Sequence, residues 1–356
     1  MAFRCVYHIT IRTIHMLLKH QHGGDIHSFA KQINCHPSEV IDLSSNINFV
    51  KPSINFDFNT LEIAPYPNYE KLQNSIAKLY QIQSTQLELF NGATSAIYSL
   101  FRLLKPKHAT LYAPLYLEYE KALKITRCDI DQVNRFQDIY KEVKKSSLVI
   151  FVNPSTPDGK YYDLNKLMKI WMEKNCIIVI DESFLDFTPY KSIISYLKKY
   201  SKLYILKSMT KFYAAAGIRV GALLSNEKNI QAINEHEPLW KISEFDSHYL
   251  QEALKDEKFK LKAQQQNEKV RKKLVNILEH FSYTKKIYTS QANFILVQLT
   301  HINAFTLQEE LIPFKIMIRN CKNFKFLDEY HVRLALKSNQ NIESLKMALE
   351  KLYLYK

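Results

Sequence analysis

Continuous apolar runs alternate with amphipathic stretches along the first two thirds of the chain. Three apolar runs cover 146–153, 176–181 and 201–208, and the second of them is mostly β-branched. Such runs are typical of strands that are buried on both faces of a parallel sheet. Stretches with apolar residues at three- and four-residue spacing predict helices at 69–80, 116–126 and 163–175. The alternation of the two patterns predicts a doubly wound, mostly parallel α/β core.

The pattern changes beyond the last of these strands. Long charged helices follow, then two strand-like segments at 292–299 and 331–337, and then a final helix. This order predicts a smaller C-terminal α+β domain. We therefore expect three parts. Residues 1–45 form an N-terminal arm that also contributes to the small domain, residues 46–235 form the large α/β domain, and residues 236–356 form the rest of the small domain.

The composition is that of a folded protein in a reducing compartment. The chain has 356 residues, of which 46% are hydrophobic, enough apolar material for two cores and too much for a disordered chain. Its five cysteines form no C-x-x-C pair, so neither a disulfide framework nor a thiolate zinc site is indicated, and we expect no metal. No apolar run approaches the roughly 18 residues of a membrane span. We expect a cytoplasmic protein without membrane association, and we interpret the basic opening segment 1–20 as a leader or arm.

The charge balance points to anionic binding partners. There are 49 lysines and arginines against 35 acids, which gives a formal charge of +14 and suits an anionic partner or anionic substrates. A nucleic-acid-binding protein would gather this charge on one face and interleave it with aromatic residues. Here the lysines are spread over the predicted helices, and no nucleic-acid-binding motif is present. Nucleic-acid binding is therefore the weaker alternative.

Glycine is rare, with six in the whole chain, so each glycine marks a place where a side chain does not fit or where φ is positive. Gly92 stands where a turn enters a predicted helix and leaves Ala93 and Thr94 in its first turn. The free backbone N–H groups there can cradle an anion, although a helix simply capped by Asn91 is the more common arrangement. Gly159 closes a proline-rich turn that directly follows a predicted strand.

Two chemically active side chains follow predicted strands. Asp181 ends the run 176–181 and is either a loop acid or a carboxylate at a site, because ligands bind at the carboxyl ends of the strands in α/β sheets. Lys211 lies three residues beyond the run 201–208, among apolar and aromatic neighbours. Such surroundings lower the pKa of an amine and make it a candidate nucleophile.

Pyridoxal 5′-phosphate needs this combination of groups. The cofactor requires an amine for its aldehyde, a carboxylate that keeps its pyridine nitrogen protonated, a donor to its ring hydroxyl and several donors to its phosphate. The motifs NGAT, VNPSTPDG, IDESFLDF and KSMTKFYAAAGIRVG resemble those of the fold type I pyridoxal-phosphate enzymes. The similarity is to the branch shared by histidinol-phosphate aminotransferases and threonine-phosphate decarboxylases, and it runs from about His22 to the C-terminus.

The resemblance implies a role for each matching residue. Lys211 would bond the aldehyde, Asp181 would pair with the pyridine nitrogen and Asn153 would bind the ring hydroxyl. The phosphate would be held by Ala93, Thr94, Ser208 and Arg219. Tyr116 would stack on the ring, with a core tyrosine at a helix start as the alternative. Tyr66 would reach across a homodimer interface to the partner's cofactor phosphate.

Three segments favour the decarboxylases within this branch. The opening HGGDI with the later SSNIN resembles theirs, Phe184 stands where the aminotransferases commonly carry a tyrosine, and the segment IMIRNCKNFKFLDEYHVRLALKS resembles their C-terminal segment. Arg333 alternates with apolar neighbours and so points away from them, as a strand arginine does when it faces a cleft or forms a surface ion pair. The resemblance implies a substrate site made of Arg333, Arg319, Asn48 and His22.

The implied reaction is decarboxylation of O-phospho-L-threonine or O-phospho-L-serine to an amino-alcohol phosphate, with transamination of the histidinol-phosphate type as the alternative. If threonine phosphate is the substrate, the product would feed corrinoid (cobalamin) biosynthesis. The chain also departs from the family pattern. It lacks the Pro-Leu-Gly that usually follows Asn48, it has Ala216 where a proline is common, and it has Ser-Thr-Pro-Asp at 155–158 in place of Asn-Asn-Pro-Thr. The two phosphoesters differ by one methyl group, about 1 kcal/mol of discrimination, so the choice between them stays open.

Overall fold

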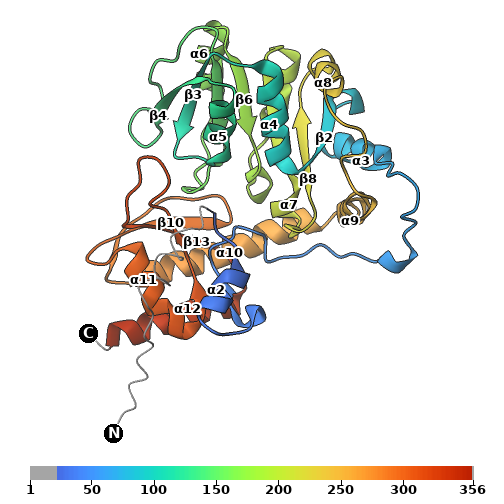
Figure 1. Cartoon of the computed structure of the whole chain (residues 1–356). Coiled ribbons are helices and arrows are strands. Elements are labelled where there is room, and N and C mark those ends of the chain that lie inside the picture. Colours follow the sequence, from blue (N-terminus) through green and yellow to red (C-terminus); the bar gives the residue numbers. More distant parts are fainter. Residues whose placement is uncertain (1–21, 355–356) are drawn as a thin grey trace.

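The computed structural model describes residues 22–354 of the chain. The opening segment 1–20, interpreted as a leader or arm, lies outside the described residues. Figure 1 shows a large sheet with its helices above a smaller sheet that packs with the C-terminal helices. No helix within residues 22–354 is long and apolar enough to cross a membrane.

The large sheet has seven strands in the order β2-β8-β7-β6-β5-β3-β4. Their bounds are β2 Leu87–Asn91, β3 His108–Ala113, β4 Asp129–Asn134, β5 Leu148–Val152, β6 Ile177–Asp181, β7 Leu203–Ser208 and β8 Val220–Leu224. The pairs from β4 to β7 are parallel, whereas β8 is antiparallel to both of its neighbours. The three strands predicted from continuous apolar runs are β5, β6 and β7, side by side at the centre of the sheet. The doubly wound, mostly parallel fold is thereby confirmed.

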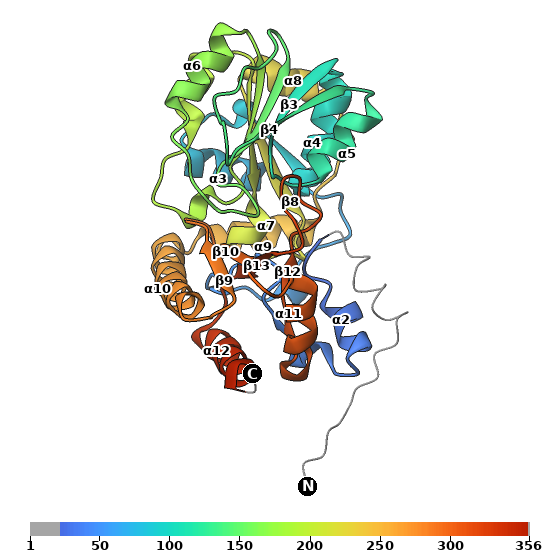
Figure 2. The ribbon, with the colours of Figure 1, turned by 90° about the vertical axis from the view of Figure 1, so that its left-hand side faces the viewer.

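Helices cover both faces of this sheet, as Figure 2 shows. Their bounds are α3 Glu70–Tyr80, α4 Gly92–Leu104, α5 Glu118–Ile125, α6 Asn165–Glu173 and α8 Glu227–Asn234. Successive strand residues point to opposite faces. Val149 and Phe151 pack in the core with α3 and α6, while Leu148 and Ile150 pack in the core with α4 and α5. The central strands are therefore apolar throughout because neither face meets water.

The small domain is built on an antiparallel sheet in the order β12-β13-β10-β9. Its strands are β9 Thr284–Ile287, β10 Phe294–Leu299, β12 Arg319–Asn320 and β13 His331–Ala335, and its helices include α11 Ala304–Leu311 and α12 Asn339–Leu354. The segment that contains α2 Ile26–Gln32 joins this domain, because β1 Ile41–Asp42 pairs in parallel with β11 Ile316–Met317. The separate C-terminal domain expected from the sequence is confirmed.

Helix α10 connects the large and small parts, and two shorter helices precede it. The short α7, Met209–Phe212, follows β7 directly, and α9, Glu244–Leu254, packs against α3. Helix α10, Phe259–Glu279, contributes Phe259 and Ala263 to a core of the large domain and Val270 and Leu274 to the core of the small domain. One continuous helix thus contributes to the cores of both domains.

A buried ion pair lies directly behind the ends of β6 and β7. Lys207 Nζ is 2.6 Å from Glu182 Oε2, and both side chains are no more than 3% exposed. Glu182 also accepts hydrogen bonds from the Ser192 hydroxyl at 2.6 Å and from the Ile193 backbone N–H at 3.0 Å. The ammonium of Lys207 lies 4.5 Å from the ring centroid of Tyr80. These contacts tie the residue after β6 to the end of β7.

Removing one partner of this pair should be strongly destabilising. Lys207→Met leaves the Glu182 carboxylate buried without its cation, so we expect the free energy of unfolding to fall by about 3–5 kcal/mol in urea denaturation. Adding Glu182→Leu should recover much of the loss. Lys169→Met is the matched control, since Lys169 pairs at the surface with Glu173 at 3.9 Å and should change stability by less than about 1 kcal/mol. Equal losses in the two single variants would contradict the expectation.

Candidate active site

The carboxyl ends of β5, β6 and β7 bring the predicted chemical groups to one edge of the sheet. Asp181 is the last residue of β6, Ser208 is the last residue of β7, and Lys211 lies in α7 directly after it. Asp181 is aligned with Leu206 on the neighbouring strand. Residues far apart in the sequence therefore meet here because neighbouring parallel strands end together.

The amine of Lys211 lies among aromatic rings and charged groups. Its Nζ is 4.3 Å from the centroid of the Phe184 ring and 5.9 Å from that of Tyr116. The pKa of Lys211 is lowered to about 8, mainly by burial; Asp181 opposes this shift, and Arg333 and Arg219 add to it. The predicted loss of basicity is thus present, and its main cause is desolvation.

Asp181 is buried and held by two donors. Its Oδ1 accepts a hydrogen bond from the Ser183 backbone N–H and its Oδ2 accepts one from the Tyr119 hydroxyl, each at 2.8 Å. Burial, with Asp181 next to it, raises the pKa of Tyr119 well above its ordinary value, so the hydroxyl stays a donor. The sequence analysis does not identify Tyr119 as a partner of Asp181. The signal that could have suggested it is that Tyr119 lies three residues after Tyr116, on the same face of the predicted helix.

An anion cradle forms where α4 begins. Gly92 has φ +78°, and a Cβ there would lie 2.5 Å from Nη2 of Arg219. A Cβ on Gly221 would lie 2.3 Å from the backbone nitrogen of Ala93. The two glycines therefore let the guanidinium and strand β8 approach the first turn of α4. Free N–H groups at that turn, together with a cation, provide the chemistry that a phosphate group needs.

Hydroxyl groups surround the same turn. Thr94 Oγ1 is 3.2 Å from the hydroxyl of Tyr116, and Ser208 Oγ is 3.1 Å from Oγ1 of Thr210. Arg219 donates from Nη1 to the Ala216 carbonyl at 3.1 Å. The structure thus brings Thr94, Tyr116 and Arg219 to one cradle. Ser208 lies beside it, because it pairs with Gly221 of β8.

Both polar atoms of the Asn153 side-chain amide form hydrogen bonds to the backbone of Tyr162. Its Nδ2 donates to the Tyr162 carbonyl and its Oδ1 accepts from the Tyr162 backbone N–H, both at 2.9 Å. These bonds use one of the two amide hydrogens. The role of Asn153 toward the ring hydroxyl stays a prediction.

The two predicted anion-binding arginines face each other across neighbouring strands of the small sheet. Arg319 on β12 and Arg333 on β13 are in register, and they are 7% and 5% exposed. Arg333 donates from Nη1 to Thr156 Oγ1 at 2.7 Å and from Nη2 to the Ser44 carbonyl. Arg319 donates from Nη2 to Asn323 Oδ1 at 2.7 Å. Burial lowers the pKa of Arg333 to about 10, and the neighbouring Arg319 adds to this effect.

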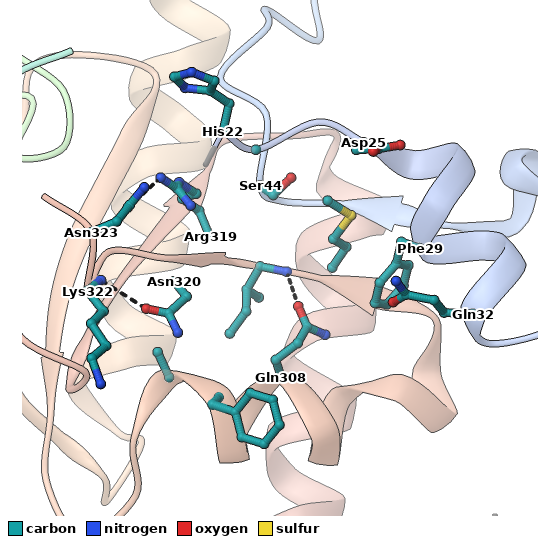
Figure 3. A pocket seen from close by; sticks show the side chains of 15 residues that line it. His22, Asp25, Phe29, Gln32, Ser44, Gln308, Arg319, Asn320, Lys322 and Asn323 are labelled. Atoms are coloured by element: carbon teal, nitrogen blue, oxygen red, sulfur yellow. Dashed lines mark hydrogen bonds between the residues drawn. The ribbon is translucent and has the colours of Figure 1, made fainter. Parts of the chain in front are cut away.

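A cavity of about 360 Å³ opens beside Arg319, between α2, β12 and α11 (Figure 3). His22, Ser44, Arg319 and Asn323 line it, and Figure 3 shows the Arg319 side chain directed toward Asn323. His22 Nε2 is 3.1 Å from Glu118 Oε1, and its ring centroid is 5.6 Å from that of Tyr116. His22 therefore lies between this cavity and the predicted ring-stacking residue.

Asn48 contacts the segment that carries Lys211, whereas Tyr66 lies at the protein surface. The backbone N–H of Asn48 donates to the Lys211 carbonyl at 3.0 Å, and its Nδ2 donates to the Phe212 carbonyl at 2.9 Å. Asn48 thus binds the backbone of the lysine segment, and its contact with substrate stays a prediction. Tyr66 is 73% exposed and stacks on Trp240 with ring centroids 4.1 Å apart. It lies at the surface of its own subunit.

Comparison with known proteins identifies the family. Residues 38–352 match the family model for aminotransferase class I and II. The chain belongs to this family. Its members depend on pyridoxal 5′-phosphate, which is the cofactor predicted from the sequence. The Lys211 amine, the Asp181 carboxylate and the anion cradle at the edge of the large sheet fit that cofactor.

Three similar proteins illustrate the range of the family. The adenosylcobalamin biosynthesis bifunctional protein of Leptospira interrogans is 29% identical over 94% of this chain, which spans 41% of that relative's length. The threonine-phosphate decarboxylase of Salmonella typhimurium is 26% identical over 94% of this chain and 96% of its own. The crystal structure of the histidinol-phosphate aminotransferase from Clostridium acetobutylicum superposes with a TM-score of 0.79 at 28% identity, covering 88% of this chain and 99% of that chain.

The lowered pKa of Lys211 should set the pH dependence of cofactor attachment. Only the uncharged amine attacks the aldehyde, so in protein stripped of cofactor we expect the rate of pyridoxal 5′-phosphate attachment to rise with pH to about 8 and then level off. Asp181→Asn removes the charge that raises this pKa, and should move the midpoint to lower pH. Absorbance stopped-flow measures the rate. A rate that still rises past about pH 10, as for an ordinary lysine, would contradict the assignment.

Loss of the Arg219 guanidinium at the anion cradle should weaken binding of the cofactor through its phosphate group. Arg219→Met removes a charged donor, so we expect roughly tenfold to a hundredfold weaker binding of pyridoxal 5′-phosphate. Binding of pyridoxal, which has no phosphate, should change little. Arg102→Met is the control, because Arg102 is exposed at the far end of α4 beside Glu237. Equal weakening of both ligands in an equilibrium titration would place Arg219 outside the phosphate site.

Proposed function

We propose that the protein decarboxylates a phosphorylated hydroxy-amino acid, O-phospho-L-serine or O-phospho-L-threonine, to an amino-alcohol phosphate. The observation that carries the proposal is the pair of buried arginines in register on β12 and β13. Arg333 is close enough to Lys211 to lower the pKa of its amine, and the two guanidinium groups offer two anion positions, one for a carboxylate and one for a phosphate. The names of two relatives, a threonine-phosphate decarboxylase and an adenosylcobalamin biosynthesis protein, support this substrate class.

We assign each residue of the site a separate role in the proposed reaction. Arg333 binds the substrate carboxylate, and Arg319 with His22 binds the phosphate. When bound, pyridoxal 5′-phosphate supplies an electron sink for the bond that breaks at Cα. Asp181 holds a proton on the pyridine nitrogen, and Tyr119 and Ser183 hold Asp181 in place. The substrate is thereby fixed at two anionic ends relative to one ring.

Proton balance gives Lys211 a second role. Decarboxylation releases carbon dioxide and takes up one proton at Cα, so a nearby acid must supply it. An ammonium group with a pKa of about 8 is suited to give up a proton near neutral pH. Phe184, which lies against the Lys211 amine, has no hydroxyl with which to compete for that role.

Transamination is the alternative within the same family. The histidinol-phosphate aminotransferase from Clostridium acetobutylicum has the same fold over 88% of this chain. Both reactions use a phosphorylated amine substrate and the same lysine. They differ in which bond at Cα is held perpendicular to the cofactor ring, and that orientation depends on the anion-binding residues.

The proposal includes a homodimer with two composite sites. Tyr66 stacks on Trp240 at the surface, and Ile63 and Leu239 are also strongly exposed. An exposed group of large apolar residues indicates an interface. We propose that a second copy covers this surface and that Tyr66 reaches the partner's cofactor phosphate.

The decisive assay is product identity without an acceptor. With O-phospho-L-serine or O-phospho-L-threonine and no 2-oxo acid, we expect one carbon dioxide and one amino-alcohol phosphate per substrate, and no turnover in Lys211→Ala. Trapped carbon dioxide and phosphorus NMR measure the two products. Stoichiometric conversion of 2-oxoglutarate to glutamate with histidinol phosphate, and no carbon dioxide from either phosphoester, would identify the protein as the aminotransferase.

A further inference from the structure

Trp240 combines an exposed ring with a backbone conformation that bulky residues rarely adopt. Its φ is +54°, in the left-handed region, and the residue is 51% exposed. A bulky residue in this region is under backbone strain. Because the ring is exposed, packing in the core of its own subunit does not account for the strain. Strained residues gather at functional sites, which makes Trp240 a candidate for such a role.

The residues that follow Trp240 are held firmly in the large domain. The ammonium of Lys241 is 2.7 Å from Glu88 Oε1 and 3.4 Å from Glu237 Oε2, and the Lys241 side chain is 8% exposed. Ile242 is buried in a core of the large domain. These contacts hold the backbone directly after Trp240. The Trp240 ring therefore projects from a rigid base.

Tyr66 is carried by a segment with much less support. The described stretch 61–69 forms neither helix nor strand, and it lies between the short 3₁₀ helix Phe58–Thr60 and helix α3. Its residues 62–66 are all exposed. The Tyr66 ring stacks on the Trp240 ring, with the centroids 4.1 Å apart and the planes inclined by 16°. The Trp240 ring is thus the surface that holds an otherwise exposed tyrosine.

The stacking determines where the Tyr66 hydroxyl lies. Both rings are rigid, so the position of the hydroxyl follows from the position of the stacked ring. A hydrogen bond forms only over a narrow range of distance and angle, and a group that must first be ordered contributes less to affinity. A tyrosine that is already held in one place therefore binds its acceptor more tightly than the same tyrosine on a free loop.

We propose that Trp240 is a positioning residue that holds Tyr66 in place for the cofactor phosphate of the partner subunit. This inference rests on the proposed function, in which a second copy covers the surface around Tyr66. Proteins of this family are typically homodimers. Leu239 is 73% exposed and Ile63 is 61% exposed, so the neighbours of both stacked rings extend the same apolar surface. Each subunit thus contributes two stacked rings, rather than one tyrosine, to the other subunit's site.

The first test separates a loss of phosphate binding from a general loss of structure. Trp240→Ala removes the stacking surface and leaves the Tyr66 hydroxyl in the chain. We expect about tenfold weaker binding of pyridoxal 5′-phosphate in an equilibrium titration of the full chain, as for loss of a hydrogen bond to a charged group. Binding of pyridoxal, which has no phosphate, should be unchanged. Trp240→Phe keeps an aromatic ring and should restore most of the affinity.

A double variant shows whether the two rings act together. Tyr66→Phe removes only the hydroxyl and should weaken binding of pyridoxal 5′-phosphate by about tenfold or more. If Trp240 acts through Tyr66, adding Trp240→Ala to Tyr66→Phe should cause little further loss. Tyr190→Ala is the matched control, because Tyr190 is 44% exposed and stacks on Tyr161 with the centroids 3.9 Å apart. It should leave the affinity for both ligands unchanged.

Hybrid dimers test whether the pair acts on the partner's site. Borohydride fixes the cofactor only in a subunit that has Lys211, so the covalently held cofactor reports on that subunit alone. In a hybrid of Lys211→Ala and Trp240→Ala subunits, the reporting subunit receives Trp240 from its partner, and we expect wild-type affinity. In a hybrid of a wild-type subunit with one that carries both substitutions, we expect the tenfold weaker binding. Action within one subunit would give the reverse pattern.

The outcomes separate this inference from the proposed function. If Tyr66→Phe weakens cofactor binding and Trp240→Ala does not, the positioning role of Trp240 is overturned and the role of Tyr66 stands. Additive losses in the double variant, equal losses for pyridoxal, or the reverse pattern in the hybrids would also overturn it. If neither substitution weakens binding, the proposed role of Tyr66 fails together with that of Trp240.

None of these measurements uses the substrate. A wild type that releases no carbon dioxide from either phosphoester would therefore overturn the proposed reaction and leave the positioning role of Trp240 in place.

Discussion

The site depends on keeping a weakly basic amine next to a charged carboxylate in surroundings that disfavour charge. Burial lowers the pKa of Lys211 to about 8, and Asp181 opposes that shift. If the carboxylate were absent, the amine would lose its proton more easily and the pyridine nitrogen would lose its partner. If the burial were absent, the pKa of the amine would return toward its ordinary value of about 10.4, and a much smaller fraction would be uncharged at a given pH. Both effects come from one edge of one sheet, where β6 and β7 end side by side.

The neighbouring cations make the same site selective for anions. Arg219 lies against the first turn of α4, and Arg333 lies opposite Arg319 across two strands. Burial is the main cause of the lowered pKa of Arg333, and the charge of the neighbouring Arg319 adds to it. An anion bound between or beside them relieves the repulsion between the two charges. The overall charge of +14 thus has a local counterpart in the site.

Several contacts hold the segments that carry Asp181 and Lys211. The Lys207–Glu182 pair joins the residue that follows Asp181 to the strand that leads to Lys211. The backbone of Asn48 binds the Lys211 carbonyl from the N-terminal segment. Helix α10 contributes to both cores. The ion pair and the Asn48 contact therefore support the segments that carry Asp181 and Lys211, while α10 joins the two domains.

The sequence by itself determined the central strands, the helices between them and the identity of the groups at the strand ends. It could do so because burial on both faces leaves continuous apolar runs, and because a parallel sheet places polar residues where such runs stop. Tyr119, the Thr156 contact and the bonds of Asn153 to Tyr162 were not accessible in this way. Each is a contact between side chains or loops whose directions depend on packing. The tertiary structure alone decided how the small sheet brings Arg333 onto the loop after β5, because that contact joins residues 177 positions apart and leaves no periodic trace in the chain.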